Sequence, residues 1–595
     1  MNIKILTKPN IDSLFFLFSI LLLNIFIFSW NYSYLPITEG WFLLAGNFIR
    51  QGYLPYTDFY AYLTPFYYWY SYLILSIGEN TIFISRILGQ INLNILFLLT
   101  YKVFTINFPK PQSSIASLFS LIFYLSINAI LSYDFIHIAN IFALASFYIV
   151  STKDNKAFLF LAGFFAALCF LTKQSNGSIL YLTISIIFIY RFWKQKKVFI
   201  YPILGTFLAF FLNFFPYLSK KGISDVINNI IINAGEAKGG IIHSLTTLLP
   251  PRSDFYSFEK IQVFLLEILV PLIILFKFHK LFLKQSFESF SFNEIEFKQF
   301  DKKILLIFIL ISIVLIISYY LDIKFLIFQQ DLANFFWNKV YLWSGYCPLI
   351  FILFINNNNF DKKIGFFLFG ITFAAATSAG LTPVSIFLHV GFLICLLLSF
   401  KSYYNVGLLF TILIIFFVSS SIIADKNYKT YHWWGINSYK GDVKTNKIPF
   451  IAKIKNDGLS NHLVIINDKL KKCEIRPKNL ISFPHGAIIN LTTKIDPPTK
   501  TISYWFDFLS NEDSKKEYSK LKNMQLDAIA LISIDKNAWV VHEKLFRPED
   551  NFLIQRKIQE LLYDKVSSSS YSQIYSFVQD GVKIELHTLN SLSCN

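Results

Sequence analysis

Residues Thr38 to Arg86 read TEGWFLLAGNFIRQGYLPYTDFYAYLTPFYYWYSYLILSIGENTIFISR. This segment follows the first long apolar run, is too polar to cross a bilayer throughout, and is too aromatic for an ordinary linker. Two carboxylates, Glu39 and Asp58, lie in its first half among Trp, Tyr, Pro and Gly, and Glu79 lies near its end. Acidic side chains in an aromatic segment beside a membrane span predict one wall of a functional site at a membrane surface.

The composition excludes a water-soluble globule. Of 595 residues, 54% are hydrophobic and only 15% are charged, and the mean hydropathy is +0.49. The 67 Phe and 33 Tyr suit a lipid-facing and interfacial protein. The formal charge of +17 is scattered through short loops between apolar runs, where it sets membrane orientation, so no nucleic-acid partner is predicted.

Apolar runs long enough for helical spans recur along residues 1–423. Thirteen spans are predicted, at about 11–30, 83–104, 114–131, 139–151, 157–171, 178–192, 198–217, 261–277, 304–320, 339–355, 364–380, 384–400 and 404–423. The first run is longer than the apolar part of a signal peptide and lacks an evident cleavage site, so it is interpreted as a retained span. Lys4 and Lys8 before it, and the basic cluster RFWKQKK (191–197), predict a cytoplasmic N-terminus.

This topology puts residues 31–85 and everything after the last span outside a cell inner membrane, on the periplasmic or equivalent side. Within 31–85, Glu39–Gln51 has helical spacing of small and apolar residues, and Gly52 is predicted to end that helix. A second aromatic segment at about 62–77 is also predicted to be a helix, and both are expected to lie in the plane of the interface.

Residues 424–595 have the composition of a soluble domain, predicted to be α/β or α+β. HLVIIND (462–468) and DAIALISI (527–534) are interpreted as short buried strands, and NFLIQRKIQELLYDK (551–565) as an amphipathic helix. YSQIYSFVQDG and VKIELHTL predict a terminal hairpin with an Asp-Gly turn. The predicted fold class is an α-helical polytopic membrane protein with a C-terminal soluble α/β domain.

The cysteines and histidines show no metal-ligand spacing, so no metal site and no cofactor are predicted. Cys169, Cys347 and Cys395 fall in apolar runs and are interpreted as core residues. Cys473 and Cys594 lie in the soluble part, where a disulfide between them is one possibility.

The charged side chains on the predicted outer face come from separate loops that only a packed bundle brings together. They are Glu39, Arg50, Asp58, Arg86, Asp134, His137, Lys173, His243 and Arg252. Glu39 directly follows a span, where a carboxylate can accept the proton of an attacking hydroxyl or amine. The alternative is that it favours a helix N-terminus.

Lys173, in the outer loop LTKQSNG, runs against the usual inside bias of basic residues. Binding of a lipid phosphate or diphosphate explains it, and snorkelling to a headgroup is the alternative. Arg86 has the same two interpretations. Asp58 is either a substrate contact or a turn residue, and Asp134 and His137 are candidate substrate contacts in a short loop. Glu79 is interpreted as a solvated loop charge.

Several of these residues resemble a known family. Glu39-Gly40-Trp41, the run Gly52–Asp58, Pro65 and Arg86 resemble the first outer loop of C-type (GT-C) membrane glycosyltransferases, in the bacterial branch related to protein O-mannosyltransferases and the aminoarabinose transferase of lipid A. Thr172-Lys173-Gln174-Ser175 matches a recurrent pattern of that branch. Ser482–Gly486, Asn490 and Pro497-Pro498-Thr499 are similar to its soluble domain.

The resemblance implies transfer of a sugar from a polyprenyl-phosphate donor to a glycan, lipid or protein acceptor on the outer face, with inversion at the anomeric carbon. It implies that Glu39 is the general base. Many relatives have Asp-Glu where this chain has Thr38-Glu39. The expected substrate contacts are Asp58, Arg86, Asp134, His137, Lys173, Gln174 and Arg252.

Two other classes remain open from the sequence. A transporter or flippase of lipid-linked glycans predicts charges or broken helices near the bilayer midplane, whereas most acids and bases here lie near span ends. A non-catalytic membrane scaffold that presents residues 424–595 is the third possibility.

Overall fold

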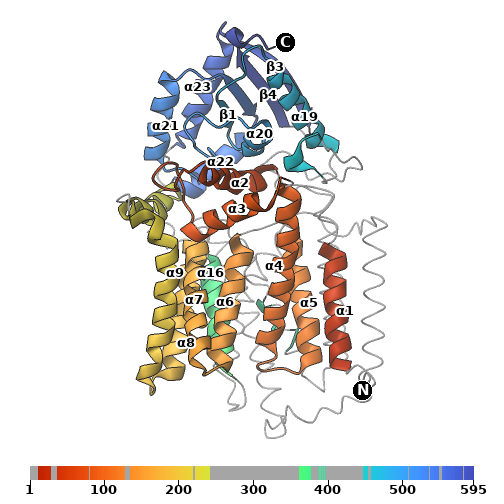
Figure 1. Ribbon diagram of the computed structural model, residues 1–595, viewed down its shortest axis with the longest axis vertical. Coiled ribbons are helices and arrows are strands. Elements are labelled where there is room, and N and C mark those ends of the chain that lie inside the picture. Colours follow the sequence, from red (N-terminus) through yellow and green to blue (C-terminus); the bar gives the residue numbers. More distant parts are fainter. Residues whose placement is uncertain are drawn as a thin grey trace, which may run out of the picture.

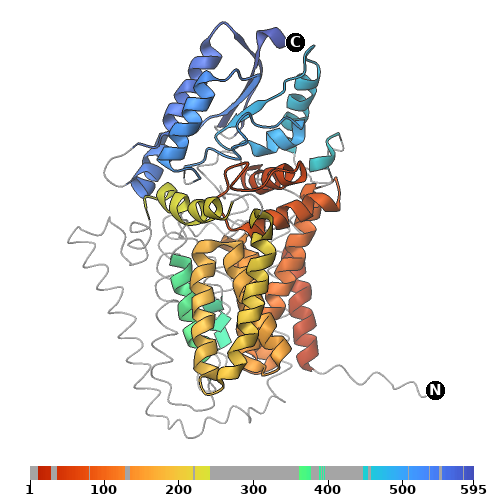
Figure 2. The same ribbon diagram turned by 60° about the vertical axis from the view of Figure 1, so that its left-hand side comes forward.

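A computed structural model describes residues 11–27, 36–79, 81–127, 135–218, 222–240, 361–376, 447–452, 457–506, 508–534, 536–547, 552–579 and 582–594, together with a few residues of 388–395. They form a helical bundle, a layer of shorter helices across one end of it, and a mixed α/β domain above that layer (Figures 1 and 2). The first described helix, α1, begins at the opposite end of the bundle, and the last described residues lie in the α/β domain (Figure 1).

The described helices of the bundle follow the predicted spans closely. They are α1 (Ile11–Ile27), α4 (Thr81–Phe104), α5 (Lys110–Ile127), α6 (Phe135–Thr152), α7 (Lys156–Thr172), α8 (Gln174–Phe192), α9 (Ile200–Leu218) and α16 (Lys363–Ala376). Within the described residues, four helical segments are long and apolar enough to cross a membrane: α4, α6, α8 and the continuous stretch Lys196–Leu218, in which the short helix η2 (Lys196–Phe199) leads into α9. The chain is therefore an integral membrane protein.

The remaining predicted spans are only partly covered. Those at 261–277, 304–320, 339–355 and 404–423 lie outside the described residues, so the total of thirteen stays a prediction. Asn107, after α4, accepts from the Asp361 amide at 2.8 Å, which puts the start of α16 at the end of the bundle away from the α/β domain. That is the direction predicted for the span at 364–380.

Two predicted loops are wrong because helices extend into them. His137 lies in α6, which begins at Phe135, and Gln174 to Gly177 form the first turn of α8. The polar sequence Gln-Ser-Asn-Gly suggested a loop, but a Cβ on Gly177 would lie 2.3 Å from the Cys169 carbonyl oxygen of α7. The missing side chain lets α7 and α8 approach closely enough to turn at a single residue.

A polar contact fixes α1 against α4 inside the bundle. Asn24 and Asn94 exchange side-chain hydrogen bonds of 2.9 and 3.0 Å, and Gln90 donates to Asn24 at 2.8 Å. Because a polar group in an apolar setting needs a partner, these three amides specify how the two helices pair.

Residues 31–85 are called the first outer segment, after the predicted topology. Its predicted helices are confirmed as α2 (Pro36–Arg50) and α3 (Pro65–Ile77). Both lie across the end of the bundle in Figure 1. Gly52 ends the α2 region with φ +93°, a backbone conformation that glycine adopts without strain. A further helical segment, not predicted, runs through α10 (Ile223–Ile227), the π-helix η3 (Asn228–Asn233) and α11 (Ala234–Ala237).

The α/β domain contains a four-stranded sheet in the order β1-β2-β4-β3. Its strands are β1 (Leu480–Phe483), β2 (Ala528–Ile532), β3 (Tyr571–Gln579) and β4 (Val582–Leu589). β1 pairs with β2 in parallel and the other neighbours are antiparallel. Its described helices are α19 (Asp457–Lys471), α20 (Ala487–Thr493), α21 (Asn511–Asn523), α22 (Lys536–Phe546) and α23 (Gln555–Ser567), with short 3-10 turns at η9 (Pro449–Ile451) and η10 (Asn590–Leu592).

The strand at 527–534, the amphipathic helix and the terminal hairpin are confirmed as β2, α23, β3 and β4. The strand predicted at 462–468 is wrong, because these residues belong to α19. Leu463, Ile466 and Leu470 are buried at helical spacing while Ile465 is exposed, so the apolar run follows a helix face. The predicted domain boundary at 424 lies outside the described residues.

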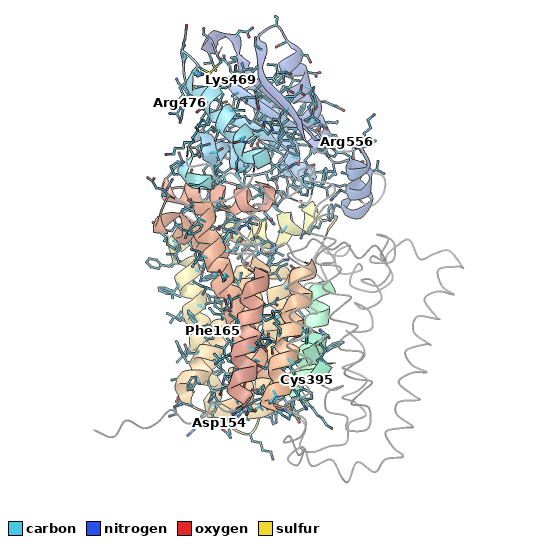
Figure 3. The ribbon with its side chains drawn as sticks, turned by 90° about the vertical axis from the view of Figure 1, so that its right-hand side faces the viewer. Asp154, Phe165, Cys395, Lys469, Arg476 and Arg556 are labelled. Atoms are coloured by element: carbon cyan, nitrogen blue, oxygen red, sulfur yellow. A yellow bond between two sulfur atoms is a disulfide. The ribbon has the colours of Figure 1, made fainter. Side chains whose placement is uncertain are left out.

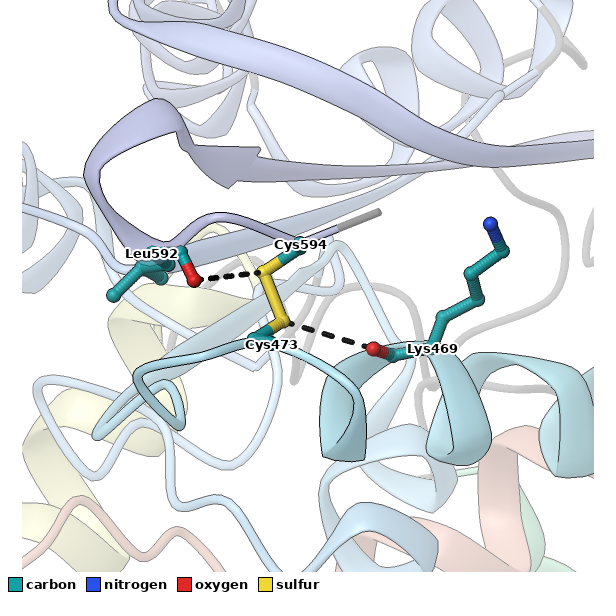
Figure 4. Close-up of a disulfide and its surroundings, with 4 residues drawn as sticks. All are labelled: Lys469, Cys473, Leu592 and Cys594. Atoms are coloured by element: carbon teal, nitrogen blue, oxygen red, sulfur yellow. Dashed lines mark hydrogen bonds between the residues drawn. A yellow bond between two sulfur atoms is a disulfide. The ribbon is translucent and has the colours of Figure 1, made fainter.

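The disulfide between Cys473 and Cys594 is present and joins the end of α19 to the chain terminus after β4 (Figure 4). Cys169 and Cys395 are buried free thiols, as expected for core residues. Cys347 lies outside the described residues.

Candidate active site

The end of the bundle beneath the α/β domain gathers most of the described candidate residues. α2, which carries Glu39 in its first turn, lies there with the N-terminal ends of α4 and α6 and the turn between α7 and α8 (Figure 1). Arg86, His137 and Lys173 are 4%, 0% and 6% exposed. Residues far apart in the sequence therefore meet at one end of the molecule.

Lys173 alone separates α7 from α8 and has an extended backbone, with φ −152° and ψ 113°. The Lys173 carbonyl accepts from the Gly177 amide at 2.8 Å. Lys173 therefore both ends α7 and caps the start of α8. Its Nζ lies 4.5 Å from the centre of the Phe135 ring. An ammonium group over an aromatic face at a helix N-terminus makes this position strongly electropositive.

Phe135 links the lysine to the first outer segment. Its ring packs edge-on against Phe42 of α2 at 5.7 Å and Tyr67 of α3 at 5.5 Å between centroids. Glu39 precedes Phe42 by three residues, less than one turn of α2. The first turn of α2 and the Lys173 turn are thus joined through one aromatic side chain.

Gln174 fastens three segments together. Its Nε2 donates to the Tyr62 carbonyl at 2.5 Å and to the Ile230 carbonyl of η3 at 3.4 Å. The Thr64 hydroxyl donates to the Phe170 carbonyl at 2.9 Å beside it. These bonds hold the α7–α8 turn against the loop before α3.

Buried tyrosines shape the same loop. The Tyr56 hydroxyl donates to the Leu63 carbonyl, and Tyr68 accepts from the Tyr62 and Leu63 amides at 3.0 and 3.2 Å. Burial raises the pKa of Tyr56 and of Tyr68 well above the ordinary value for tyrosine, so both phenols stay protonated at physiological pH. They serve as neutral hydrogen-bonding groups.

Asp58 is exposed and acts in a turn. Its Oδ2 accepts from the Leu54 amide at 2.8 Å, and its own amide donates to the Leu54 carbonyl at 3.0 Å. These contacts match the turn interpretation from the sequence, and a substrate contact for Asp58 stays a prediction. Glu79 is exposed after α3, as a solvated charge would be.

Other sequence candidates fall outside this description. Asp134, His243 and Arg252 lie outside the described residues, and of Glu39 only the helix position is described. Arg50, at the end of α2, is exposed and donates to Asn47 at 2.8 Å. Among the described residues, no three His, Cys, Asp or Glu side chains are grouped so that they could hold a metal ion.

Sequence reasoning did not identify the residues through which the α/β domain meets this site. Phe508 and Arg547 make those contacts and are 1% and 6% exposed. The aromatic run Tyr504 to Phe508 is a sequence signal that could have identified Phe508, whereas no pattern in the sequence marks Arg547.

Comparison with known proteins gives structural similarity over nearly the whole chain. The sequence matches no protein-family model, and no curated protein matches it. Among solved structures, the archaeal oligosaccharyltransferase AglB from Archaeoglobus fulgidus, in complex with an inhibitory peptide and a dolichol-phosphate, is 13% identical, with 87% of this chain and 69% of that chain covered and a TM-score of 0.44.

ArnT from Cupriavidus metallidurans is also similar. Bound to undecaprenyl phosphate it is 9% identical with a TM-score of 0.36, and in the apo state 10% identical with a TM-score of 0.38, each covering 98% of both chains.

Proposed function

We propose that this protein is a membrane glycosyltransferase that moves a sugar from a polyprenyl-phosphate donor to an acceptor at the outer face of the membrane, with Glu39 as general base. One observation carries the proposal. The helix that bears Glu39 and the buried cations Arg86 and Lys173 come from distant parts of the sequence to the same end of the bundle. Buried cations at a span end are typical of anion binding.

The chemistry fits these residue types. The acceptor hydroxyl or amine attacks the anomeric carbon, and its proton passes to the Glu39 carboxylate. The bond between the anomeric carbon and the phosphate oxygen breaks, and its electron pair leaves with the polyprenyl phosphate. Attack from the opposite side inverts the anomeric carbon.

The leaving phosphate gains negative charge, which Lys173, Arg86 and the N-terminus of α8 stabilise. His137 and Gln174 complete the bundle side, where Gln174 holds the α7–α8 turn in place. Asp134 and Arg252 are retained as proposed substrate contacts.

The orientation is part of the proposal. Basic residues gather at the end of the bundle away from the α/β domain, where Arg191 pairs with Asp154 at 2.8 Å. Figure 3 shows Asp154 at that end, far from Lys469, Arg476 and Arg556. Positive residues favour the cytoplasmic side, and a disulfide persists in an oxidising compartment. Both observations support a protein of the cell inner membrane whose α/β domain lies on the extracytoplasmic side.

The test uses the purified full chain in lipid nanodiscs with a set of polyprenyl-phosphate sugars. The proposal predicts release of free polyprenyl phosphate, dependent on an added glycan, lipid or protein acceptor. Movement of an intact lipid-linked sugar across proteoliposomes without release would instead identify a flippase. If the protein neither releases polyprenyl phosphate from any donor nor moves any donor across the membrane, the result would favour a non-catalytic scaffold.

A further inference from the structure

The helix that carries Glu39 is held between two backbones. A Cβ on Gly46 would lie 2.8 Å from the Ser71 carbonyl group of α3, below α2. A Cβ on Gly40 would lie 2.7 Å from the Ile488 amide nitrogen of α20, in the α/β domain. Only glycine permits such approaches, so the bundle-side layer and the α/β domain together fix the position of α2.

An aromatic anchor sits beside the Gly40 contact. Phe508 of the α/β domain is 1% exposed. Its ring centroid lies 6.0 Å from that of Trp41, 5.7 Å from Tyr60 and 4.5 Å from Tyr62, all in the first outer segment. Burial and edge-on packing of aromatic rings are among the strongest contacts that two surfaces make.

Polar contacts surround this anchor. Arg547 donates to the Ala237 carbonyl of α11 at 2.8 Å and to the Leu509 carbonyl, next to Phe508, at 3.4 Å. Lys500 Nζ lies 3.1 Å from the centre of the Tyr53 ring, and Gln51 donates to Asp496 at 3.3 Å. An apolar centre with a polar rim is the usual anatomy of a stable interface.

Glu39 is adjacent in the sequence to the residues of α2 that form this interface. Glu39, Gly40 and Trp41 are consecutive, and the second and third contact α20 and Phe508. Lys173 lies beyond this interface: its Nζ lies over the Phe135 ring, and the α/β domain reaches its turn through Tyr62, whose carbonyl accepts from Gln174. The α/β domain therefore contacts the segment that carries Glu39 directly and the Lys173 turn indirectly.

We infer that the α/β domain is a positioning element for the transfer reaction: its α20 and Phe508 hold the first turn of α2, and with it Glu39, in place. The inference rests on the proposed function, in which Glu39 is the base. Phe508 is a positioning residue, because it acts through Trp41 and α2. Weakening the contact of Phe508 with Trp41 lowers kcat and leaves the KM for the donor nearly unchanged.

The first test compares two truncations in the full chain in nanodiscs. Phe508→Ala removes the anchor, and Phe577→Ala removes a ring of similar burial from β3, where it stacks on His462. Because misplacement by about 1 Å can cost ~100-fold in rate, we expect Phe508→Ala to lower kcat ~10- to 100-fold with donor KM changed less than about 3-fold. Phe508→Leu should recover part of kcat. An unchanged kcat, or an equal loss in Phe577→Ala, would overturn the inference.

The second test does not need activity. Hydrogen exchange of the α2 amides should quicken ~10-fold or more in Phe508→Ala and not in Phe577→Ala, because α2 loses its aromatic contact with the α/β domain. Unchanged exchange in Phe508→Ala overturns the positioning role even when the wild type is active. If α2 responds but the wild type releases no polyprenyl phosphate from any donor, the coupling stands and the proposed function fails.

Discussion

Lys173 and Glu39 lie at the same end of the bundle, yet different parts of the molecule hold the segments that carry them. The α7–α8 turn is fixed by the close approach of Gly177 to α7, by Phe135, and by the Gln174 hydrogen bonds to the layer across the end of the bundle. The first turn of α2 is fixed at the boundary with the α/β domain by α20 and Phe508. In the proposed site, the base therefore depends on the α/β domain more directly than the cation does.

Breaking the close approach at the α7–α8 turn should have the largest effect on stability. Gly177→Val drives a side chain into the backbone of α7, and overpacking of this kind costs about 3 kcal/mol. Thermal unfolding of the whole protein in detergent measures the loss. Ser178→Val adds similar bulk to the next, exposed position and should leave the midpoint almost unchanged. Equal losses in both variants would contradict the close-packed turn.

Removing the disulfide tests whether the contact of α2 with α20 and Phe508 depends on the stability of the whole α/β domain. Cys473→Ser with Cys594→Ser opens a covalent link across 121 residues of sequence and should lower the unfolding free energy of that domain by about 2.5 kcal/mol. The contacts of α20 and Phe508 are unchanged, so transfer well below the unfolding temperature should persist. Reductant should reproduce the stability loss in the wild type and have no effect on the variant.

Neutralising Lys173 tests whether its charge binds the phosphate of the donor. A charge-assisted bond to phosphate is worth about 2 kcal/mol, so Lys173→Gln should lower kcat/KM for the donor ~30-fold, mainly through KM. Exchange of the α2 amides should not change. Lys153→Gln, at the other end of the bundle, is the matched control. A Lys173→Gln variant with normal donor KM would favour snorkelling over phosphate binding.

The smallest expected effect concerns the other acid of the first outer segment. Asp58→Ala removes the carboxylate that accepts from the Leu54 amide and should lower stability by about 1 kcal/mol. Differential scanning fluorimetry measures this, with donor and acceptor kinetics taken alongside. A large rise in the KM for either substrate without a change in stability would assign Asp58 to the substrate instead of the turn.

Local patterns were sufficient for much of the fold. Long apolar runs predicted the described spans, and Gly52 and the aromatic spacing predicted α2 and α3. The four-residue apolar core of HLVIIND was misassigned because so short a run fits a strand or one face of a helix equally well. The polar turn at Gln174–Gly177 was misassigned because its helix depends on a contact with α7, which is not local.

The candidate site was predicted only in part for the same reason. A lysine on the predicted outer face is unexpected, because basic loop residues are usually cytoplasmic, so the sequence singled out Lys173. Phe508 is marked only by a local aromatic run and Arg547 by no pattern, because their role comes from contacts between segments far apart in the sequence, such as Arg547 with Ala237 (separation 310) and Gln51 with Asp496 (separation 445). Docking between distant surfaces has no local periodicity, and the structure alone reveals it.

The most direct test of the account measures acceptor-dependent release of polyprenyl phosphate by wild type, Glu39→Gln and Glu79→Gln, each shown to be folded by its thermal midpoint. Loss of a general base costs ~100- to 10,000-fold, so Glu39→Gln should lose at least ~100-fold in kcat. Glu79→Gln, an exposed acid of the same segment, should keep the wild-type rate. Undiminished release by a folded Glu39→Gln protein would contradict the account.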